Sequence, residues 1–501
     1  MAWSVDDHSK FDYGGGAMLE KVHQDRLKKL EKIRQLGIDP YGGRYDSAED
    51  VASILGRFRE GDDSQRADAA GRLILMRPMG KLAFGHIRDE TGDMQICLRK
   101  DALDETQWAL AKLLDLGDIV GVAGELTKTR TGEITIFADR LTLLCKSLLP
   151  MPEKFHGLVD VETRFRRRYL DLMSNPGAME VAGRRIAIIE HFRWLLRKRG
   201  FVEVETPMMQ PIYGGAAALP FITHHHALDT DLYLRISPEL YLKRLLVGGM
   251  RKVFEISRVF RNEGLSTQHN PEYTLLELYQ AYADYEVMME ITEELIATAA
   301  EQIGGSARLP YGELEIDYSR PWRRATYEEL LGEHAGVSMR DPAAVREKAR
   351  QLGIDQADKA DAVVIKDVFE ATVEAHLIQP TFVKDYPADL CPLTRPKADD
   401  ASVALRFEPY VAGMELGNAY TELNDPAIQR ENLARQLAGE PDGETMRVMD
   451  EDFITALQHG MPPAGGLGIG IDRVVMLLTN RTAIREVMLF PMLRPQARAE
   501  E

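Results

Sequence analysis

Two strand-like runs joined by a charged loop, residues 252–264 and 269–279, constrain the fold of this chain more than any other feature. They carry Arg258, Arg261 and Glu263 among aromatic residues, in a pattern typical of strand–loop–strand. Charge in a buried position is costly unless it is paired or meets a ligand. An arginine there can hold a phosphate through two parallel hydrogen bonds. The pattern therefore favours a nucleotide site over the alternative, a solvated hairpin.

Composition limits the class of protein. The 501 residues, 45% of them hydrophobic, suffice for more than one core. No run approaches the roughly 18 apolar residues of a membrane helix, and residues 1–10 lack the apolar stretch of a signal peptide. Cys97, Cys145 and Cys391 lie far apart, which argues against a zinc knuckle or disulfide framework and fits the cytoplasm. The net charge of −17 disfavours indiscriminate nucleic-acid binding but permits a local basic face.

The N-terminal part is expected to consist of a disordered segment, residues 1–17, and a helical region, residues 18–65. A helix predicted over residues 19–36 is rich in lysine and arginine and has an apolar stripe at helical spacing. It is as consistent with a solvated amphipathic helix as with a helix that contacts RNA phosphates.

Residues 66–150 have a different pattern, with five short strands separated by turns and a helical stretch after the third strand. This pattern predicts a small OB-type β-barrel, a fold that binds single-stranded nucleic acid. Phe84, Gln95 and Glu133 are placed on this module to contact bases. Ordinary packing and surface positions are the alternative, which the residues alone favour slightly.

A linker is expected over residues 151–180. Its basic cluster, residues 164–169, is equally consistent with contact to an RNA backbone and with salt bridges at an interface. The remaining residues, 181–501, are expected to form a second domain with a helical insertion at about 322–378. This domain opens with a long helix over residues 182–199 and a strand over residues 201–209, which contains Pro207.

Three features of the second domain precede or follow the charged hairpin. Small residues at 214–218 let backbone approach a ligand. Three histidines at 224–226 would alternate sides of a strand, which disfavours a shared metal. Glu239 lies in the first turn of a predicted helix, where an acid is favourable in any case and where it can also face a ligand amine.

The segment of residues 405–422 carries the second group of candidate functional side chains. Glu408 and Glu415 flank a turn and suit two adjacent strands, and such paired carboxylates can hold Mg²⁺ against phosphate oxygens. Asn418, Tyr420 and Glu422 alternate, so they point to one face and form a recognition surface for a charged polar ligand.

A glycine-rich strand, residues 465–470, runs into an apolar helix at residues 471–478. It matches neither GxGxxG nor the P-loop pattern, so Rossmann and P-loop nucleotide sites are disfavoured. The glycines permit close approach to a flat ring, over which Arg473 can stack.

With these stretches in view, the chain resembles class II lysyl-tRNA synthetases over nearly its full length. Residues 254–285, with FRNEG, HNPE and ELYQAYADY, look like motif 2 of that family, residues 201–209 like motif 1 and residues 466–478 like motif 3. The SPELYLKRLLVGG and NAYTELNDP segments resemble the lysine branch in particular. The resemblance implies an α+β protein with an N-terminal OB-fold barrel and a class II catalytic domain, an antiparallel sheet flanked by helices. It also implies a homodimer with motif 1 at its interface.

The resemblance further implies a reaction, ATP-dependent ligation of L-lysine to tRNA(Lys) through a lysyl-adenylate, with Mg²⁺ as cofactor. In the nucleotide site Arg261 would hold the α-phosphate, Glu263 would read the adenine amino group, and His269 would meet the outer phosphates. Tyr273 and Arg473 would sandwich the adenine ring.

In the remaining sites, Glu408 and Glu415 would hold Mg²⁺ against the phosphates of ATP. The implied roles of the other residues are these: Glu239 and Glu422 bind the lysine amino groups; Asn418, Tyr420 and Tyr279 complete that pocket; Gly215 lies close to the substrate; Phe84, Gln95 and Glu133 read the anticodon.

Three positions depart from the family pattern: Leu219, His226 and Gln268 stand where Arg or Lys, Asn, and Arg are usual. None is a proposed catalytic residue. Two other functions stay open at this point, a paralogue that lysylates a protein and a non-catalytic RNA-binding protein. The OB module argues against the first, and the intact Arg261 and Arg473 argue against the second.

Overall fold

The computed structural model describes residues 16–152, 158, 160–216, 218–439 and 449–495. The chain divides into two compact units, Met1–Arg164 with Tyr169–Asn175, and Phe165–Arg168 with Pro176–Glu501. Most of the segment expected to be disordered, residues 1–15, lies outside the described residues, and α1 (Gly16–Gln35) begins directly after it.

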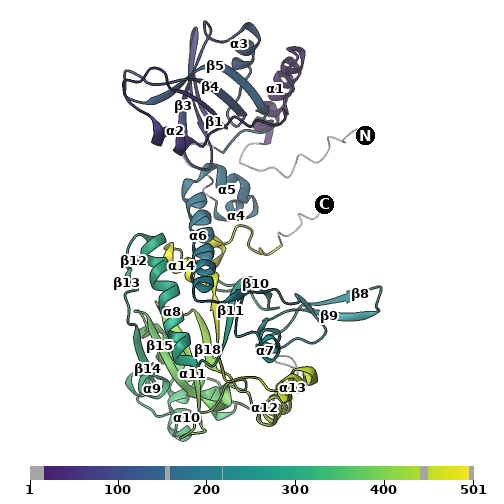
Figure 1. Cartoon of the computed structure of the whole chain (residues 1–501), viewed down its shortest axis with the longest axis vertical. Helices are drawn as coiled ribbons and strands as arrows, with labels where there is room; N and C mark the ends of the chain where they lie inside the picture. Colours follow the sequence, from purple (N-terminus) through teal and green to yellow (C-terminus); the bar gives the residue numbers. More distant parts are fainter. Residues whose placement is uncertain (1–15, 153–157, 159, 217, 440–448, 496–501) are drawn as a thin grey trace. The chain divides into compact units, whose positions relative to one another are not determined.

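The first unit contains a closed five-stranded barrel in the order β1-β2-β3-β5-β4. Its strands are β1 (Arg66–Met79), β2 (Leu82–Arg88), β3 (Asp93–Arg99), β4 (Ile119–Lys128) and β5 (Ile134–Cys145), with α3 (Glu105–Ala111) after β3 (Figure 1). Alternate residues of β2 are buried, as the period of a strand requires. The predicted barrel of five strands with a helix after the third is confirmed, and α2 (Val51–Arg57) lies within the predicted helical region of residues 18–65.

The second unit is built on a nine-stranded sheet, ordered β14-β15-β16-β18-β19-β11-β10-β6 with β17 paired to β16. Only the β14–β15 and β10–β6 pairs are parallel. The strands are β6 (Val202–Glu203), β10 (Lys252–Phe260), β11 (Glu272–Ala281), β14 (Arg323–Thr326), β15 (Thr381–Pro387), β16 (Val403–Val411), β17 (Met414–Glu415), β18 (Gly417–Thr421) and β19 (Ala464–Gly470). An α+β protein with a largely antiparallel sheet is thus confirmed.

Helices cover both faces of this sheet. On one face α6 (Pro176–Lys198), α8 (Tyr285–Ala299) and α14 (Ile471–Leu478) form the main core with Phe254 and Leu278. On the other face α7 (Glu239–Val247) and α13 (Glu451–Gln458) pack with Val253 of β10 and Tyr279 of β11, which are adjacent in sequence to Phe254 and Leu278. Neighbouring residues of β10 and β11 therefore face opposite layers, and α7 lies on the same face as Tyr279.

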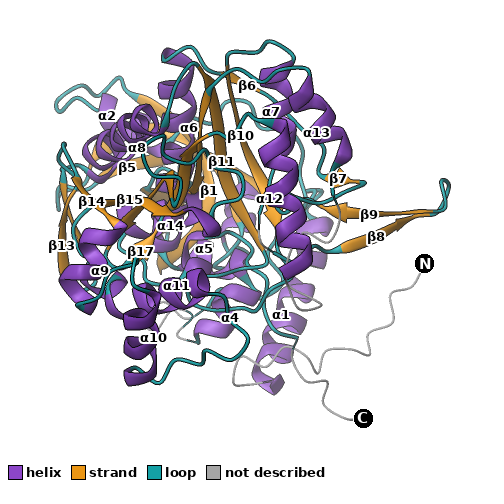
Figure 2. Ribbon diagram, turned by 90° about the horizontal axis from the view of Figure 1, so that it is seen from below, coloured by secondary structure: helices purple, strands orange, loops and turns teal. Residues whose placement is uncertain are grey.

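Two segments project from, or interrupt, this arrangement. The hairpin of β8 (Ile222–His225) and β9 (Thr230–Leu234) extends away from the sheet in both views (Figures 1 and 2). The predicted helical insertion contains α9 (Tyr327–Ala335), α10 (Pro342–Gln351) and α11 (Asp361–Thr372). The strand predicted over residues 201–209 is instead two short strands, β6 and β7 (Met209–Gln210), because the proline in between offers no N–H to a partner strand.

Candidate functional site

The first group of predicted residues meets around a buried lysine. Helix α7 presents Glu239 and Lys243 one turn apart, and both side chains are fully buried. The Lys243 ammonium lies 2.6 Å from Glu239 Oε1 and 2.5 Å from Glu422 Oε2. The structure thus brings the two carboxylates predicted to bind lysine onto a single cation of the protein itself, which the sequence reasoning did not include.

Strand register places the other predicted pocket residues on the same face. Tyr420 of β18 and Tyr279 of β11 both pair with Gly466 of β19, and Asn418 and Glu277 both pair with Gly468. β19 therefore has no side chain between the two functional rows, and this side-chain-free strip at Gly466 and Gly468 is called the glycine-floored trough below.

Close approach explains two of the glycines around this trough. A Cβ added at Gly466 would lie 2.0 Å from Glu422 Oε1 and 2.5 Å from the Tyr279 ring. Gly215, with φ +85°, leaves room for Glu239, whose Cβ would lie 3.0 Å from an added Cβ. The structure therefore places the Gly215 backbone close to Glu239. That Gly215 also lies close to the substrate stays a prediction.

A third buried carboxylate, Glu277, lines the same face. It accepts hydrogen bonds from Ser237 Oγ at 2.7 Å and from the Tyr279 hydroxyl at 3.1 Å. Burial and the negative charge of Glu239 raise the pKa of Glu277 to about 8. Burial likewise raises the pKa of Glu422 to about 8, against the opposing attraction of Lys243. Free of a ligand, the pocket therefore holds protons near neutral pH.

The predicted ATP residues form a second group along the loop after β10, β11 itself and α14. Arg473 donates to the Glu415 backbone oxygen at 2.5 Å and to His269 Nε2 at 3.1 Å. Burial and the nearby arginines lower the pKa of His269, so its imidazole is neutral and accepts from Arg473. The Arg261 guanidinium lies over the Tyr273 ring at 5.4 Å, on a ring that was predicted to stack on adenine. Glu263 is exposed in the loop after β10.

The two carboxylates predicted to hold Mg²⁺ lie at neighbouring register positions, since Glu415 pairs with Tyr410, two residues beyond Glu408. Burial and the charge of Glu408 raise the pKa of Glu415 to about 7. Glu408 accepts from the hydroxyls of Tyr386 at 2.6 Å and Tyr410 at 3.0 Å and is paired with Arg406.

This donor set fits a cation that is completed by phosphate. Mg²⁺ is commonly bound by one or two carboxylates plus substrate oxygens rather than by an all-protein cage. Across the described ranges, no group of three or more His, Cys, Asp and Glu side chains is arranged to hold a metal.

The predicted anticodon residues form a separate group on the barrel. Gln95 Nε2 donates to Glu133 Oε2 at 2.5 Å, and Thr135 Oγ1 donates to Gln95 Oε1 at 2.6 Å. Phe84 and His86 lie two apart on β2, so they share a face, and His86 Nε2 lies 2.7 Å from Glu133 Oε1. The face thus carries an aromatic ring and polar side chains that can hydrogen-bond to bases. His86 was not predicted to belong to it, because only the β2–β3 register, which pairs His86 with Gln95, brings it there.

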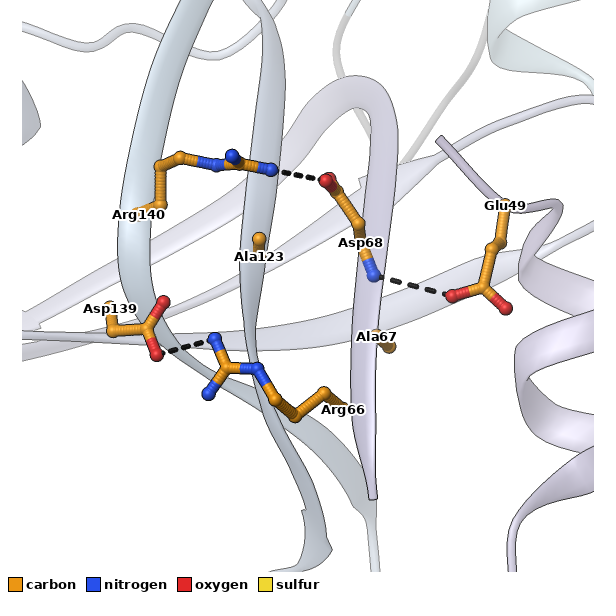
Figure 3. Close-up of a pocket in the computed structure, with 7 residues that line it drawn as sticks. All are labelled: Glu49, Arg66, Ala67, Asp68, Ala123, Asp139 and Arg140. Atoms are coloured by element: carbon orange, nitrogen blue, oxygen red, sulfur yellow. Dashed lines mark hydrogen bonds and ion pairs between the residues drawn. The ribbon is translucent and has the colours of Figure 1, made fainter. Parts of the chain in front are cut away.

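A pocket of about 390 Å³ lies on another part of the barrel, lined by residues of β1, β4 and β5 and by Glu49 (Figure 3). Its two arginines are paired, Arg66 with Asp139 at 2.6 Å and Arg140 with Asp68. Three acids against two arginines give this pocket no excess positive charge for a phosphate.

The three departures from the family pattern border the hairpin loop or the projecting strands. The Leu219 carbonyl accepts from Asn262 N at 2.8 Å, so its backbone supports the motif 2 loop whatever its side chain. The His226 ring packs 5.2 Å from the His224 ring, and Gln268 is exposed. In the basic cluster of residues 164–169, Arg168 is buried and donates to the Glu486 carbonyl at 3.1 Å, which gives this arginine a structural role.

Comparison with known proteins agrees with this geometry. The family described as "tRNA synthetases class II (D, K and N)" matches residues 160–494, and "OB-fold nucleic acid binding domain" matches residues 69–144. The chain is 49% identical to the lysine–tRNA ligase of Carboxydothermus hydrogenoformans, over 95% of this chain and 99% of that protein. It is 50% identical to that of Pelotomaculum thermopropionicum, over 95% and 96%, and 46% identical to that of Staphylococcus saprophyticus, over 94% and 98%. Two domains matched in order, and half the residues shared along almost the whole length of these relatives, show that the chain belongs to the lysine–tRNA ligase family of class II tRNA synthetases.

Proposed function

We propose that this chain is an enzyme that ligates L-lysine to tRNA(Lys) in an ATP-dependent reaction, through a lysyl-adenylate. The observation that carries the assignment of its lysine pocket is the glycine-floored trough, in which Glu239 and Glu422 are buried beside Tyr279. Buried carboxylates left without a cationic ligand are costly, so a site of this kind selects an amino acid with a charged side chain.

The arrangement supports a mechanism of positioning and electrostatics. The trough holds the lysine amino groups, so the lysine carboxylate points toward the ATP group and attacks the α-phosphorus in line, and pyrophosphate leaves. Arg261 offsets the negative charge that develops around phosphorus, while His269 and Arg473 bind the rest of the nucleotide. The terminal ribose hydroxyl of tRNA then attacks the carbonyl carbon of the anhydride, and AMP leaves.

We assign the Mg²⁺ cofactor to Glu408 and Glu415. When bound, the ion neutralises charge on the phosphates of ATP. The adjacent register of the two carboxylates supports this assignment, and so does the raised pKa of Glu415, which burial and the charge of Glu408 cause. Pyrophosphate exchange at full rate in excess chelator would contradict it.

The specificity of the pocket is tested by ATP–pyrophosphate exchange across all amino acids, with norleucine included as the lysine analogue that lacks the ε-amino group. We expect exchange with lysine and a rate with norleucine lower by about 10³-fold or more, because norleucine leaves a buried carboxylate unpaired. Exchange with another amino acid and none with lysine would overturn the assignment, and failure to charge purified tRNA(Lys) would favour a paralogue with another acceptor.

We place the anticodon of tRNA on the face of Phe84, Gln95 and Glu133. Replacing Phe84 by alanine should raise KM for tRNA(Lys) about 10- to 100-fold, since one base stacked on an aromatic ring is worth about 1–3 kcal/mol. Exchange without tRNA should be unchanged. Arg66→Ala, in the pocket of Figure 3, is the matched control on the same barrel and should leave KM for tRNA as it is. Equal effects of both substitutions would move the RNA contact elsewhere.

We also propose a homodimer in the cytoplasm. Ile186 and Trp194 of α6 and Val202 of β6 are more than half exposed, close to the motif 1 segment. These side chains support an interaction surface in this region, and a second copy of the chain is the partner that the family resemblance implies. A single-chain mass in sedimentation equilibrium would exclude the homodimer. Three free cysteines suit a reducing compartment, which cell fractionation would test. Among the described residues no helix is long and apolar enough to cross a membrane.

A further inference from the structure

Lys243 is the most deeply buried cation of the lysine pocket. Its side chain has no exposed surface, and its ammonium touches one oxygen of each carboxylate, Glu239 Oε1 and Glu422 Oε2. The other oxygen of Glu422, Oε1, is buried and has no hydrogen-bond partner among the described residues. Lys243 therefore orients both carboxylates and still leaves acceptor capacity aimed at the trough.

The barrel contains a second lysine of the same kind, and the comparison shows what is unusual at Lys243. Lys146 is also fully buried, and it lies 2.7 Å from Asp115 Oδ2 and 2.9 Å from Asp118 Oδ1. There the remaining acceptors are used: Asp118 accepts from Ser147 N and Asp115 N, and Asp115 Oδ1 pairs with Lys29. The Lys146 cluster is complete within the protein, whereas the Lys243 cluster is not.

A count of charges on the pocket face explains why the Lys243 cluster is incomplete without a ligand. Three buried carboxylates, Glu239, Glu277 and Glu422, stand against one ammonium group, that of Lys243. Arg406, which lies over the Tyr420 ring, is paired with Glu408. When all three carboxylates are ionised, two negative charges are uncompensated, which equals the number of ammonium groups on a lysine molecule. With no internal lysine the excess would be three, and with a second one it would be one.

We infer that Lys243 is a positioning and specificity-determining residue: a fixed internal counter-ion that aligns Glu239 and Glu422 and sets the charge of the pocket to match an amino acid with two ammonium groups. The inference rests on the proposed lysine pocket and deepens it. Lys243 stays in place when the substrate binds, and the substrate ammonium groups take the oxygens that Lys243 leaves free.

Ionisation in the pocket follows from this arrangement. Burial opposes the charge of Lys243, but the attraction of Glu239 and Glu422 outweighs it and raises its pKa, so Lys243 stays charged. Glu422 lies beside Lys243 and Glu239 on α7, and its charge also acts on Tyr279 of β11 and Tyr420 of β18, on both of which Glu277 acts as well. Since the pKa values of Glu277 and Glu422 are about 8, lysine binding releases protons at pH 7, and KM for lysine should fall as pH rises toward 8.

The test compares Lys243→Met with Lys146→Met in lysine-dependent pyrophosphate exchange, which needs no tRNA, at pH values from 6 to 9. We expect Lys243→Met to raise KM for lysine by about 100-fold and KM for ATP by less than about 3-fold, because breaking a buried ion pair leaves like charges together. Its pH profile of kcat/KM for lysine should shift upward by about one unit or more, because the carboxylates have lost their counter-ion. Lys146→Met should change neither.

Lys243→Gln is measured alongside, because the amide keeps donors for both carboxylates but carries no charge. The glutamine variant keeps the test possible if the methionine variant does not fold. Its pH profile of kcat/KM for lysine should show the same upward shift. Equal increases in both KM values with an unshifted pH profile, in either variant that folds, would reduce Lys243 to a structural role. Absence of lysine-dependent exchange in the wild type would instead overturn the proposed function, so the two failures are distinct.

Discussion

Replacing Arg261 by alanine should abolish lysyl-adenylate formation and leave tRNA binding intact. Arg261 follows β10, where its backbone N–H donates to the Pro271 carbonyl at 2.8 Å and its guanidinium rests on Tyr273. In the proposed mechanism its charge meets the phosphate that gains negative charge in the transition state. Removing such a group typically lowers the rate by about 10³-fold or more. Pyrophosphate exchange measures the loss, and gel-shift or filter binding measures the tRNA.

Arg251→Ala is the control for this substitution. Arg251 stands just before the same strand and stacks on Tyr282, away from the proposed phosphates. We expect exchange within about 3-fold of wild type. If Arg261→Ala kept wild-type exchange, or if it lost tRNA binding together with exchange, the phosphate role would be wrong. In the proposed site the outer phosphates would meet His269 as a neutral hydrogen-bonding ring, because burial and the nearby arginines lower its pKa.

Replacing Glu422 by glutamine should raise KM for lysine by about 10²–10³-fold while KM for ATP stays near its wild-type value. The carboxylate is 1% exposed and carries a free buried oxygen, so the substitution removes one charge partner of the substrate and one of Lys243. Loss of one partner of a buried charge pair costs about 2–5 kcal/mol. The measurement is exchange as a function of lysine and of ATP concentration.

The pH dependence gives a second readout for Glu422→Gln. The pKa of Glu422 is raised to about 8, so in the wild type a proton leaves when lysine binds and KM for lysine is higher at pH 6 than at pH 8. The glutamine cannot titrate, and the remaining pH dependence is that of Glu277. Glu293→Gln, a buried carboxylate that accepts from Trp322 N at 3.0 Å, is the control. Matching losses in the two variants would mean general destabilisation.

The hairpin, the barrel and the rows of alternating polar residues could be predicted from the sequence because each is encoded by a local period. Lys243 is spaced four residues from Glu239, so their contact was within reach of helical spacing. Its contact with Glu422 was not, because it depends on how β18 and α7 pack across the sheet. His86 was missed for a similar reason, since only strand register brings it to Glu133. The strand predicted at residues 201–209 is two short strands in the structure, because Pro207 between them has no N–H to pair with a neighbouring strand.

The floor of the trough has a consequence for the size of the amino acid that the enzyme accepts. Gly466 and Gly468 add no side chain of their own beneath Glu422 and Tyr279, and peptide backbone has no rotamers and cannot repack around a shorter or longer ligand. A slip of β19 by one residue would put Leu467 or Ile469 there, with the trough filled by a branched side chain. We therefore expect interstrand hydrogen bonds to fix the spacing between the floor and the carboxylates, and this backbone spacing to discriminate between homologues that differ by one methylene.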